Sequence, residues 1–487
     1  MTFTTLTFLI FLALFFPLYW GLRQRRAQNV LIVLASYVFY GWWDWRFCGL
    51  MLAASLLDYA VGLGLEKTDV LRRRKLLLAL GLTANLGLLA YFKYFNFFAE
   101  SLQAAAASVG WTMDLPTLKV VLPVGISFYT FQTMSYSIDI YRRQLRATPH
   151  LVEYLAYVSF FPQLVAGPIE RATHLLPQFF RARVFNPAQA VDGCRQMLWG
   201  FFKKMVVADN LAPVVDAVFL KPADCTGGEL AVATVLFAVQ IYCDFSAYSD
   251  IAIGLAKLFG FELMRNFANP YFSQSLGEFW RRWHISLTTW FKDYVYLPLG
   301  GSRVSKPRRV CNVLVTFLLS GLWHGASWNF VAWGAINGLA VLPETLSSNR
   351  ATRGVSEVAG GESILPSPKT AGRMLLTFAL VCLGWIFFRA HSLSDACLIV
   401  QRIFRDVFYL EGYFLGLTRL QERPAGTFVL WMIVLVALVE WLQRREPHAL
   451  TVHRWPQALR WAAYLALATA IVLAGTYSTG LFIYFQF

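Results

Sequence analysis

The chain of 487 residues is 57% hydrophobic and only 15% charged, and its mean hydropathy is +0.50. Soluble domains carry about 25% charged residues, so this composition excludes an ordinary soluble protein and predicts an all-α polytopic membrane protein. The formal net charge of +15 does not indicate nucleic-acid binding, because the basic residues cluster beside apolar segments, as membrane topology requires.

Apolar runs without charge follow one another along the chain and predict the membrane crossings. A spanning helix needs about 17–25 residues, so the shorter runs must include flanking polar residues or form partial helices. We expect about 8 to 11 crossings together with re-entrant pieces. The charge-free runs are residues 1–22, 28–43, 76–92, 120–138, 230–243, 310–343, 374–388, 425–439 and 461–487.

The basic residues predict the orientation of the chain in the membrane. Residues 1–140 are expected to form five spans, and clusters of Arg and Lys follow the first, third and fifth of them, at residues 23–26, 72–75 and 142–146, whereas the intervening loops are poor in both. Because cytoplasmic loops are enriched in Lys and Arg, this alternation places the N-terminus outside the cytoplasm. The first run lacks a basic n-region and a small-residue cleavage site, so it is predicted to be a span and not a signal peptide.

The seven cysteines indicate neither a disulfide framework nor a zinc site. Their number is odd, and no C-x-x-C pair occurs among them. Most lie in or beside apolar runs, where a free cysteine behaves as a small hydrophobic residue. We therefore expect no bound metal.

The middle of the chain departs from the pattern of regular spans. Prolines and basic residues interrupt short apolar pieces between residues 142 and 310, and residues 161–171 mix helix breakers with polar groups. Irregular backbone at membrane depth is tolerated only where protein buries it or where it lines a cavity. We expect one membrane domain over 1–487, with N-terminal spans at 1–141, a catalytic core with re-entrant segments at 142–343, and C-terminal spans at 372–487.

Residues 310–343 carry no Asp, Glu, Lys or Arg but contain His324 near their middle. At about 1.5 Å per residue the segment is too long for one simple crossing of roughly 30 Å, so it predicts a hairpin that dips into the membrane, or a single tilted helix. An ionisable group at membrane depth is costly and indicates a functional site. Gly321 and Gly325 allow close approach, and Asn329 is a candidate to orient the imidazole or a substrate. The alternative is a core histidine satisfied by a neighbouring helix.

A second candidate segment, residues 269–290, contains His284. Ser275 followed by Glu278 forms a capping-box pattern and predicts a helix that starts there. At helical spacing Arg281, His284 and Thr288 would share one face, beside an apolar stripe. An amphipathic helix at the membrane interface would explain the Trp and Arg residues equally well, but His284 less well.

Two carboxylates, Asp244 and Asp250, lie in the otherwise apolar residues 240–254. They could form a polar wall of a substrate passage. Alternatively, Asp250 pairs with Lys257 or Arg265, and Ser249 caps a following helix.

Four runs together resemble the membrane-bound O-acyltransferase (MBOAT) superfamily, and within it the bacterial alginate O-acetylase branch. The runs are QLVAGPIER at 163–171, YCDFSAYSDIAIGLAKLFGF at 242–261, FWRRWHISLTTWFKDYVYLPLGGSR at 279–303 and GLWHGASWNFVAWGAINGL at 321–339. The closing run at 482–487 is similar as well. Ala247 stands where relatives often carry Gly, a difference without an expected effect on the chemistry.

The resemblance implies a fold, an activity and a location. The fold would be a ring of helices around a thinned centre, in a multi-pass protein of the bacterial inner membrane. The activity would be that of an O-acetyltransferase (EC 2.3.1.-) that moves acetyl from a cytoplasmic thioester, acetyl-CoA or an acyl carrier, toward an exported polysaccharide such as alginate. Transfer would be direct or through a periplasmic SGNH-type acetyltransferase partner, with no bound cofactor.

The resemblance also implies roles for individual residues. His324, in the WHG run, would be the principal catalytic residue, and His284, in the WRRWH run, the second. The candidate substrate-binding residues are Trp323, Asn329, Arg281, Asp244 and Asp250. We hypothesise that His324 removes the acceptor hydroxyl proton, and that His284 or Asn329 orients or stabilises the tetrahedral intermediate. No Ser lies in a G-x-S-x-G context, so a serine acyl-enzyme is not expected, whereas a covalent His or Cys route stays open.

Three alternatives remain open from the sequence. A transporter would bind its substrate at the midplane through broken helices, but the two related halves that this predicts are not found. A haem or metal protein would use His284 and His324 as axial ligands. Transfer of D-alanine from a carrier protein to teichoic acid would keep the chain within the superfamily.

Overall fold

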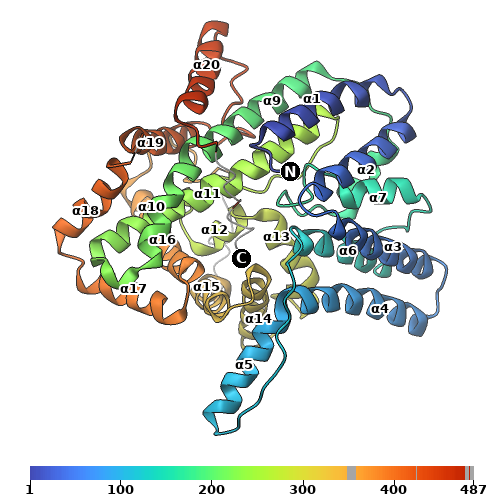
Figure 1. The fold of residues 1–487 in the computed structure, drawn as a ribbon, viewed down its shortest axis with the longest axis horizontal. Helices are drawn as coiled ribbons and strands as arrows, with labels where there is room; N and C mark the ends of the chain where they lie inside the picture. The colour runs from blue at the N-terminus through green and yellow to red at the C-terminus, as the bar shows by residue number, and fades with distance from the viewer. Residues whose placement is uncertain (348–357, 424, 478–481, 483–487) are drawn as a thin grey trace. The chain divides into compact units, whose positions relative to one another are not determined.

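All regular structure in the described part of the chain is helical (Figure 1). This confirms the expected all-α class. The computed structural model describes residues 1–347, 358–423, 425–477 and 482. Of the closing run at 482–487, only Phe482 therefore lies among the described residues. The chain divides into two units, an N-terminal unit (residues 1–190 and 255–264) and a C-terminal unit (residues 191–254 and 265–487). The expected segments 1–141, 142–343 and 372–487 follow the order of helices along the chain and not these units.

The N-terminal unit contains the first helices of the chain. α4 continues through a π-helical turn, η1, directly into α5, so these two form one long apolar helix. The elements are α1 (Leu6–Gly21), α2 (Arg25–Gly41), α3 (Arg46–Glu66), α4 (Leu71–Leu89), η1 (Ala90–Tyr94), α5 (Phe95–Ser108), α6 (Ile126–Tyr141), α7 (Leu151–Ser159), α8 (Ala172–Leu175) and η2 (Leu176–Phe180). Residues 161–171, between α7 and α8, are turns and coil, and nearly all of them are buried, in agreement with the helix breakers of that segment.

The C-terminal unit holds all seven candidate site residues. Its elements are α9 (Pro187–Phe201), η3 (Phe202–Ala208), α10 (Asp209–Leu220), η4 (Pro222–Asp224), α11 (Gly227–Leu258), η5 (Pro270–Phe272), α12 (Leu276–Arg282), α13 (Ile285–Phe291), η6 (Lys292–Tyr296), α14 (Lys306–His324), α15 (Trp328–Leu346), α16 (Pro368–Arg389), α17 (Leu393–Arg405), α18 (Leu410–Gln421), α19 (Gly426–Leu442) and α20 (Gln457–Ala474). The first residues of α9 (187–190) and the last residues of α11 (255–258) belong to the N-terminal unit. Short helices and π turns are frequent between α9 and α14, as the interrupted sequence predicts.

Five helices of the described residues are long and apolar enough to span a membrane, or six if the bent pair α18–α19 is one span. The five are α3, α4–α5, α11, α16 and α20. This number is below the 8 to 11 crossings expected, because several apolar runs form helices of 16 or 17 residues, such as α1 and α2. The protein is nevertheless a polytopic helical membrane protein.

Residues 310–343 form a helical hairpin and not a single tilted helix. α14 and α15 lie side by side, joined by residues 325–327 (Figure 1). A Cβ atom on Gly321 would lie 2.1 Å from the Phe330 carbonyl oxygen, and one on Gly334 would lie 2.5 Å from the Phe317 carbonyl oxygen. Glycine at both positions therefore allows the two backbones to pack at close range. His324 is the last residue of α14, near the apex of this hairpin.

Candidate active site

The segment around His284 is two short helices and not the continuous helix that the spacing suggests. Ser275 caps α12 by accepting a hydrogen bond from the Glu278 backbone N–H at 3.2 Å, which confirms the predicted start. α12 ends at Arg282, and His284 has a left-handed backbone with φ of 45° before α13 begins. A non-glycine residue in this region is strained and interrupts a helix.

His284 and His324 line one cavity of about 280 Å³ in the C-terminal unit. Both imidazoles are buried, with 1% and 5% of their residue surfaces exposed. Arg281 and Thr288 also line this cavity, so the three residues expected to share one helix face lie around one cavity instead, because the helix is broken at His284. Its apolar wall comprises Trp280, Trp283, Leu287, Phe291, Val313, Phe317 and Val341. A largely apolar cavity with a few polar groups is the usual form of a small-molecule site.

Aromatic rings surround the His324 imidazole. Its ring centroid lies 5.0 Å from that of Trp333 and 5.2 Å from that of Phe388, both in edge-to-face geometry. The turn after His324 packs as tightly, because a Cβ atom on Gly325 would lie 2.1 Å from the Phe330 ring. These contacts fix the position of the imidazole at the end of α14.

Trp323 contacts both histidines. Its ring centroid lies 5.8 Å from that of His284 and 5.0 Å from that of His324. Trp323 is 4% exposed and is not among the residues that line the cavity. The structure therefore places this candidate substrate-binding residue against both imidazoles and outside the lining of the cavity.

His284 is held by residues distant in sequence. Its Nδ1 lies 3.2 Å from Oδ1 of Asn266, and its ring packs edge-on against Phe245 of α11, with centroids 4.7 Å apart. Asn266 and Phe245 carry no catalytic signal in the sequence, and only the fold identifies them.

Two cationic side chains lie at the exposed edge of the cavity. Arg281 and Lys292 both line it, and both side chains are exposed. Arg281 donates to Glu344 Oε1 at 3.2 Å. Lys292 Nζ lies 4.0 Å from Asp293 Oδ1, so each of the two cations also has an acidic neighbour.

The Asn329 side chain supports the hairpin. Its Nδ2 donates to the Ala390 carbonyl oxygen at 2.6 Å, directly after the end of α16, and its backbone N–H bonds to the capping Ser327 hydroxyl. Asn329 is buried but does not line the cavity with the two histidines.

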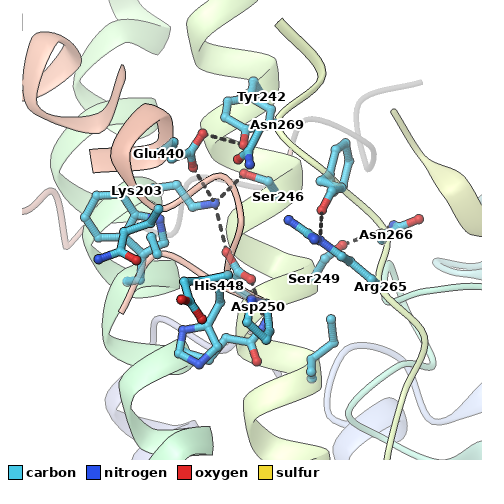
Figure 2. A pocket seen from close by; sticks show the side chains of 18 residues that line it. Lys203, Tyr242, Ser246, Ser249, Asp250, Arg265, Asn266, Asn269, Glu440 and His448 are labelled. Carbon is cyan, nitrogen blue, oxygen red and sulfur yellow. Dashed lines mark hydrogen bonds and ion pairs between the residues drawn. The ribbon is translucent and has the colours of Figure 1, made fainter. Parts of the chain in front are cut away.

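Asp244 and Asp250 of α11 belong to a separate group of buried and half-buried charges around the two lysines of the π turn η3. Lys203 Nζ contacts Asp250 at 2.8 Å, Glu440 at 3.6 Å and the Ser246 hydroxyl at 2.6 Å (Figure 2). Lys204 likewise lies 2.7 Å from Asp209 and 2.5 Å from Asp244. The structure thus does not bring either carboxylate into the histidine cavity.

The ion-pair partner of Asp250 in the structure is one that the sequence analysis did not consider. Lys203 takes this role, and Arg265 donates to the Phe267 carbonyl oxygen. Ser249 lies inside α11 and does not cap a following helix. The missed signal was the pair Lys203-Lys204 within the apolar run 197–208, since two adjacent lysines in such a run require buried acidic partners.

Within the described ranges, no three or more His, Cys, Asp or Glu side chains gather closely enough to hold a metal ion. A neutral imidazole accepts a proton from a hydroxyl and returns it to a leaving group, which are the two proton transfers that acyl transfer needs.

Comparison with known proteins decides the family. The profile of the membrane-bound O-acyltransferase family, MBOAT, matches residues 42–353, which include both histidines. The chain belongs to the MBOAT family. This MBOAT protein is therefore an O-acyltransferase, and its two cavity histidines lie within the matched region.

Relatives of this MBOAT protein extend the similarity over most of its length. It is 42% identical to the probable alginate O-acetylase AlgI of Azotobacter vinelandii, over 80% of this chain and 75% of the relative. It is 39% identical to the probable alginate O-acetylase AlgI of Pseudomonas aeruginosa, over 88% and 79%. It is 31% identical to the peptidoglycan O-acetyltransferase of Helicobacter pylori, over 95% and 93%.

Proposed function

We propose that this MBOAT protein transfers an acetyl group from a cytoplasmic thioester, acetyl-CoA, for O-acetylation of an exported polysaccharide such as alginate. The observation that carries the proposal is the single cavity lined by His284 and His324, in a chain similar to polysaccharide O-acetylases. The two exposed cations at its edge suit the phosphates of coenzyme A, while the apolar wall suits the thioester end.

In the proposed mechanism His324 is the general base. It takes the proton of the acceptor hydroxyl while the hydroxyl oxygen attacks the thioester carbonyl carbon. The tetrahedral intermediate then collapses, the carbon–sulfur bond breaks, and the thiolate takes the proton from the imidazolium, so free thiol and ester result. Proton transfer by a positioned histidine contributes typically 10²–10⁴-fold in rate. His284 orients the substrate, and Trp323 and Asn329 support the two imidazoles and the hairpin.

The acceptor is either the polysaccharide itself or a periplasmic SGNH-type acetyltransferase that passes the acetyl group on. The protein is proposed to lie in the bacterial inner membrane with its N-terminus in the periplasm, as the basic loops indicate. A topology reporter fused before residue 1 tests this orientation, and a cytoplasmic signal contradicts it.

The deciding experiment supplies labelled acetyl-CoA to the cytoplasmic face of membranes that contain the full chain. Candidate acceptors are alginate, peptidoglycan and the acetyltransferase partner, each offered separately. Label that reaches one of them, and fails to do so with His324→Ala, supports the proposal. Transfer of D-alanine from a carrier protein, without acetyl transfer, would overturn the donor assignment.

A further inference from the structure

Asn266 is fully buried and makes hydrogen bonds from every part of its side chain. Its Oδ1 lies 3.2 Å from His284 Nδ1, 3.2 Å from the Ser286 backbone nitrogen and 2.9 Å from the Ser286 hydroxyl oxygen. Its Nδ2 donates to the Ser249 hydroxyl oxygen on α11 at 3.1 Å. The side chain thus joins the residues around His284 to the central helix of the C-terminal unit.

These contacts fix which atom of the Asn266 amide faces His284. A backbone N–H can only donate, so the amide atom beside the Ser286 nitrogen has to be the oxygen. The same oxygen faces His284 Nδ1, and an oxygen acceptor requires that this nitrogen carry the proton. The lone pair of the neutral ring then lies on Nε2.

The backbone of the same segment also depends on Asn266. His284 has φ of 45°, a conformation that costs a non-glycine residue on the order of 1–3 kcal/mol. The backbone carbonyl of Asn266 accepts the Ile285 N–H at 2.9 Å, directly after the strained residue. Asn266 therefore holds both the ring and the backbone of His284 in place.

We propose that Asn266 is a positioning residue, which keeps Nδ1 of His284 protonated so that Nε2 accepts a hydrogen bond from the substrate during acyl transfer. The role of His284 Nε2 toward the substrate rests on the proposed function, whereas the tautomer is inferred from the hydrogen bonds alone. The tautomer also refines that function. A neutral His284 in this tautomer cannot donate from Nε2 to an oxyanion, so it orients a hydroxyl or amide group of the substrate while His324 acts as the base.

The tautomer can be observed independently of activity. In full-length protein labelled with ¹⁵N-histidine, the His284 signals are those absent from His284→Gln. We expect the wild-type spectrum to show a protonated Nδ1 and an unprotonated Nε2 at this residue. A protonated Nε2 with an unprotonated Nδ1 would overturn the proposal.

Two substitutions of Asn266 separate positioning from packing. Asn266→Leu keeps the volume but removes the acceptor, and we expect loss of the Nδ1-protonated form and a fall in kcat of at least about tenfold with little change in KM. Asn266→Asp keeps an acceptor oxygen, and we expect it to retain the tautomer and to restore part of kcat. If the Leu variant does not fold, the wild-type and Asp spectra still decide.

Two control variants distinguish a specific effect on the His284 tautomer from a general loss of packing. Asn312 is another buried asparagine, 1% exposed, whose Nδ2 donates to the Gly301 carbonyl, so Asn312→Leu should lower stability without changing the His284 tautomer. Ser249→Ala removes only the partner of Asn266 Nδ2 and should also keep the tautomer. An equal loss of the Nδ1-protonated form in Asn312→Leu would show a general packing effect and contradict the proposal. Wild-type activity of His284→Ala would instead refute the role of His284 in the proposed function and leave the tautomer result standing.

Discussion

His284 and His324 line the same cavity, although one follows a short broken helix and the other ends the first arm of a hairpin. The indole of Trp323 packs against both imidazole rings. This arrangement places two imidazoles in a largely apolar cavity. Such surroundings disfavour a charged imidazolium but leave a neutral imidazole able to accept a proton.

Replacement of the cavity histidines should abolish most of the activity while the protein remains folded. We expect His324→Ala to lower the rate of acetyl transfer by on the order of 10²–10⁴, because it removes the proton acceptor. Initial rates with labelled acetyl-CoA measure this, and thermal unfolding in detergent checks folding. His453 is exposed and remote in sequence from both helices, so His453→Ala is the control and should keep full activity. Near-wild-type rates in His324→Ala would refute its role as the base.

The cation at the cavity edge should act on donor binding and not on chemistry. Lys292→Gln is expected to raise KM for acetyl-CoA by about two- to fivefold at unchanged kcat, the range of one solvent-exposed charge. The difference from wild type should shrink at high salt, since salt screens exposed charges. Lys306→Gln removes an exposed charge outside the cavity and is the control. A changed kcat with an unchanged KM would contradict the binding role.

The buried ion pairs of Lys203 should matter for stability. Lys203→Met leaves the Asp250 and Glu440 carboxylates without their common cation, which costs on the order of 3–5 kcal/mol for a buried pair. A lower midpoint of thermal unfolding in detergent is the expected measurement. Adding Asp250→Asn removes one stranded charge and should recover part of the loss. Lys221 is exposed, and Lys221→Met should leave the midpoint unchanged. Equal midpoints for the two single variants would show that the pairs do not stabilise the fold.

Close packing of the hairpin predicts an effect of a single methyl group. Gly321→Ala places a Cβ against the Phe330 carbonyl oxygen, so α14 and α15 must separate, at a cost of about 1–3 kcal/mol. Activity should fall as well, because His324 lies at the end of the displaced helix. Gly372 in α16 is the control, because a Cβ atom there would have no neighbour within 4 Å. Gly372→Ala should therefore leave stability unchanged or raise it by up to about 1 kcal/mol. Wild-type stability and activity of Gly321→Ala would contradict the prediction.

Local patterns were sufficient for the helical membrane class and for the cap at Ser275, whereas the choice between a hairpin and a single tilted helix at 310–343 was left to the structure. The low charge and the long apolar runs are visible in the sequence and predict membrane helices. The cap at Ser275 depends only on two residues three positions apart. The break at His284 could not be predicted, because Asn266 from another segment holds the left-handed backbone there. A helical pattern alone favoured one continuous helix.

The sequence by itself thus determined that the chain is a helical membrane protein with an imidazole in a long charge-free segment, since hydropathy and charge density are properties of neighbouring residues. Only the tertiary structure decided which side chains meet. It brought His284 and His324 to one cavity, directed Asp250 to Lys203 and gave His284 its partner Asn266. Such pairings depend on contacts between residues distant in sequence, and their free energy comes from burial that no local pattern encodes.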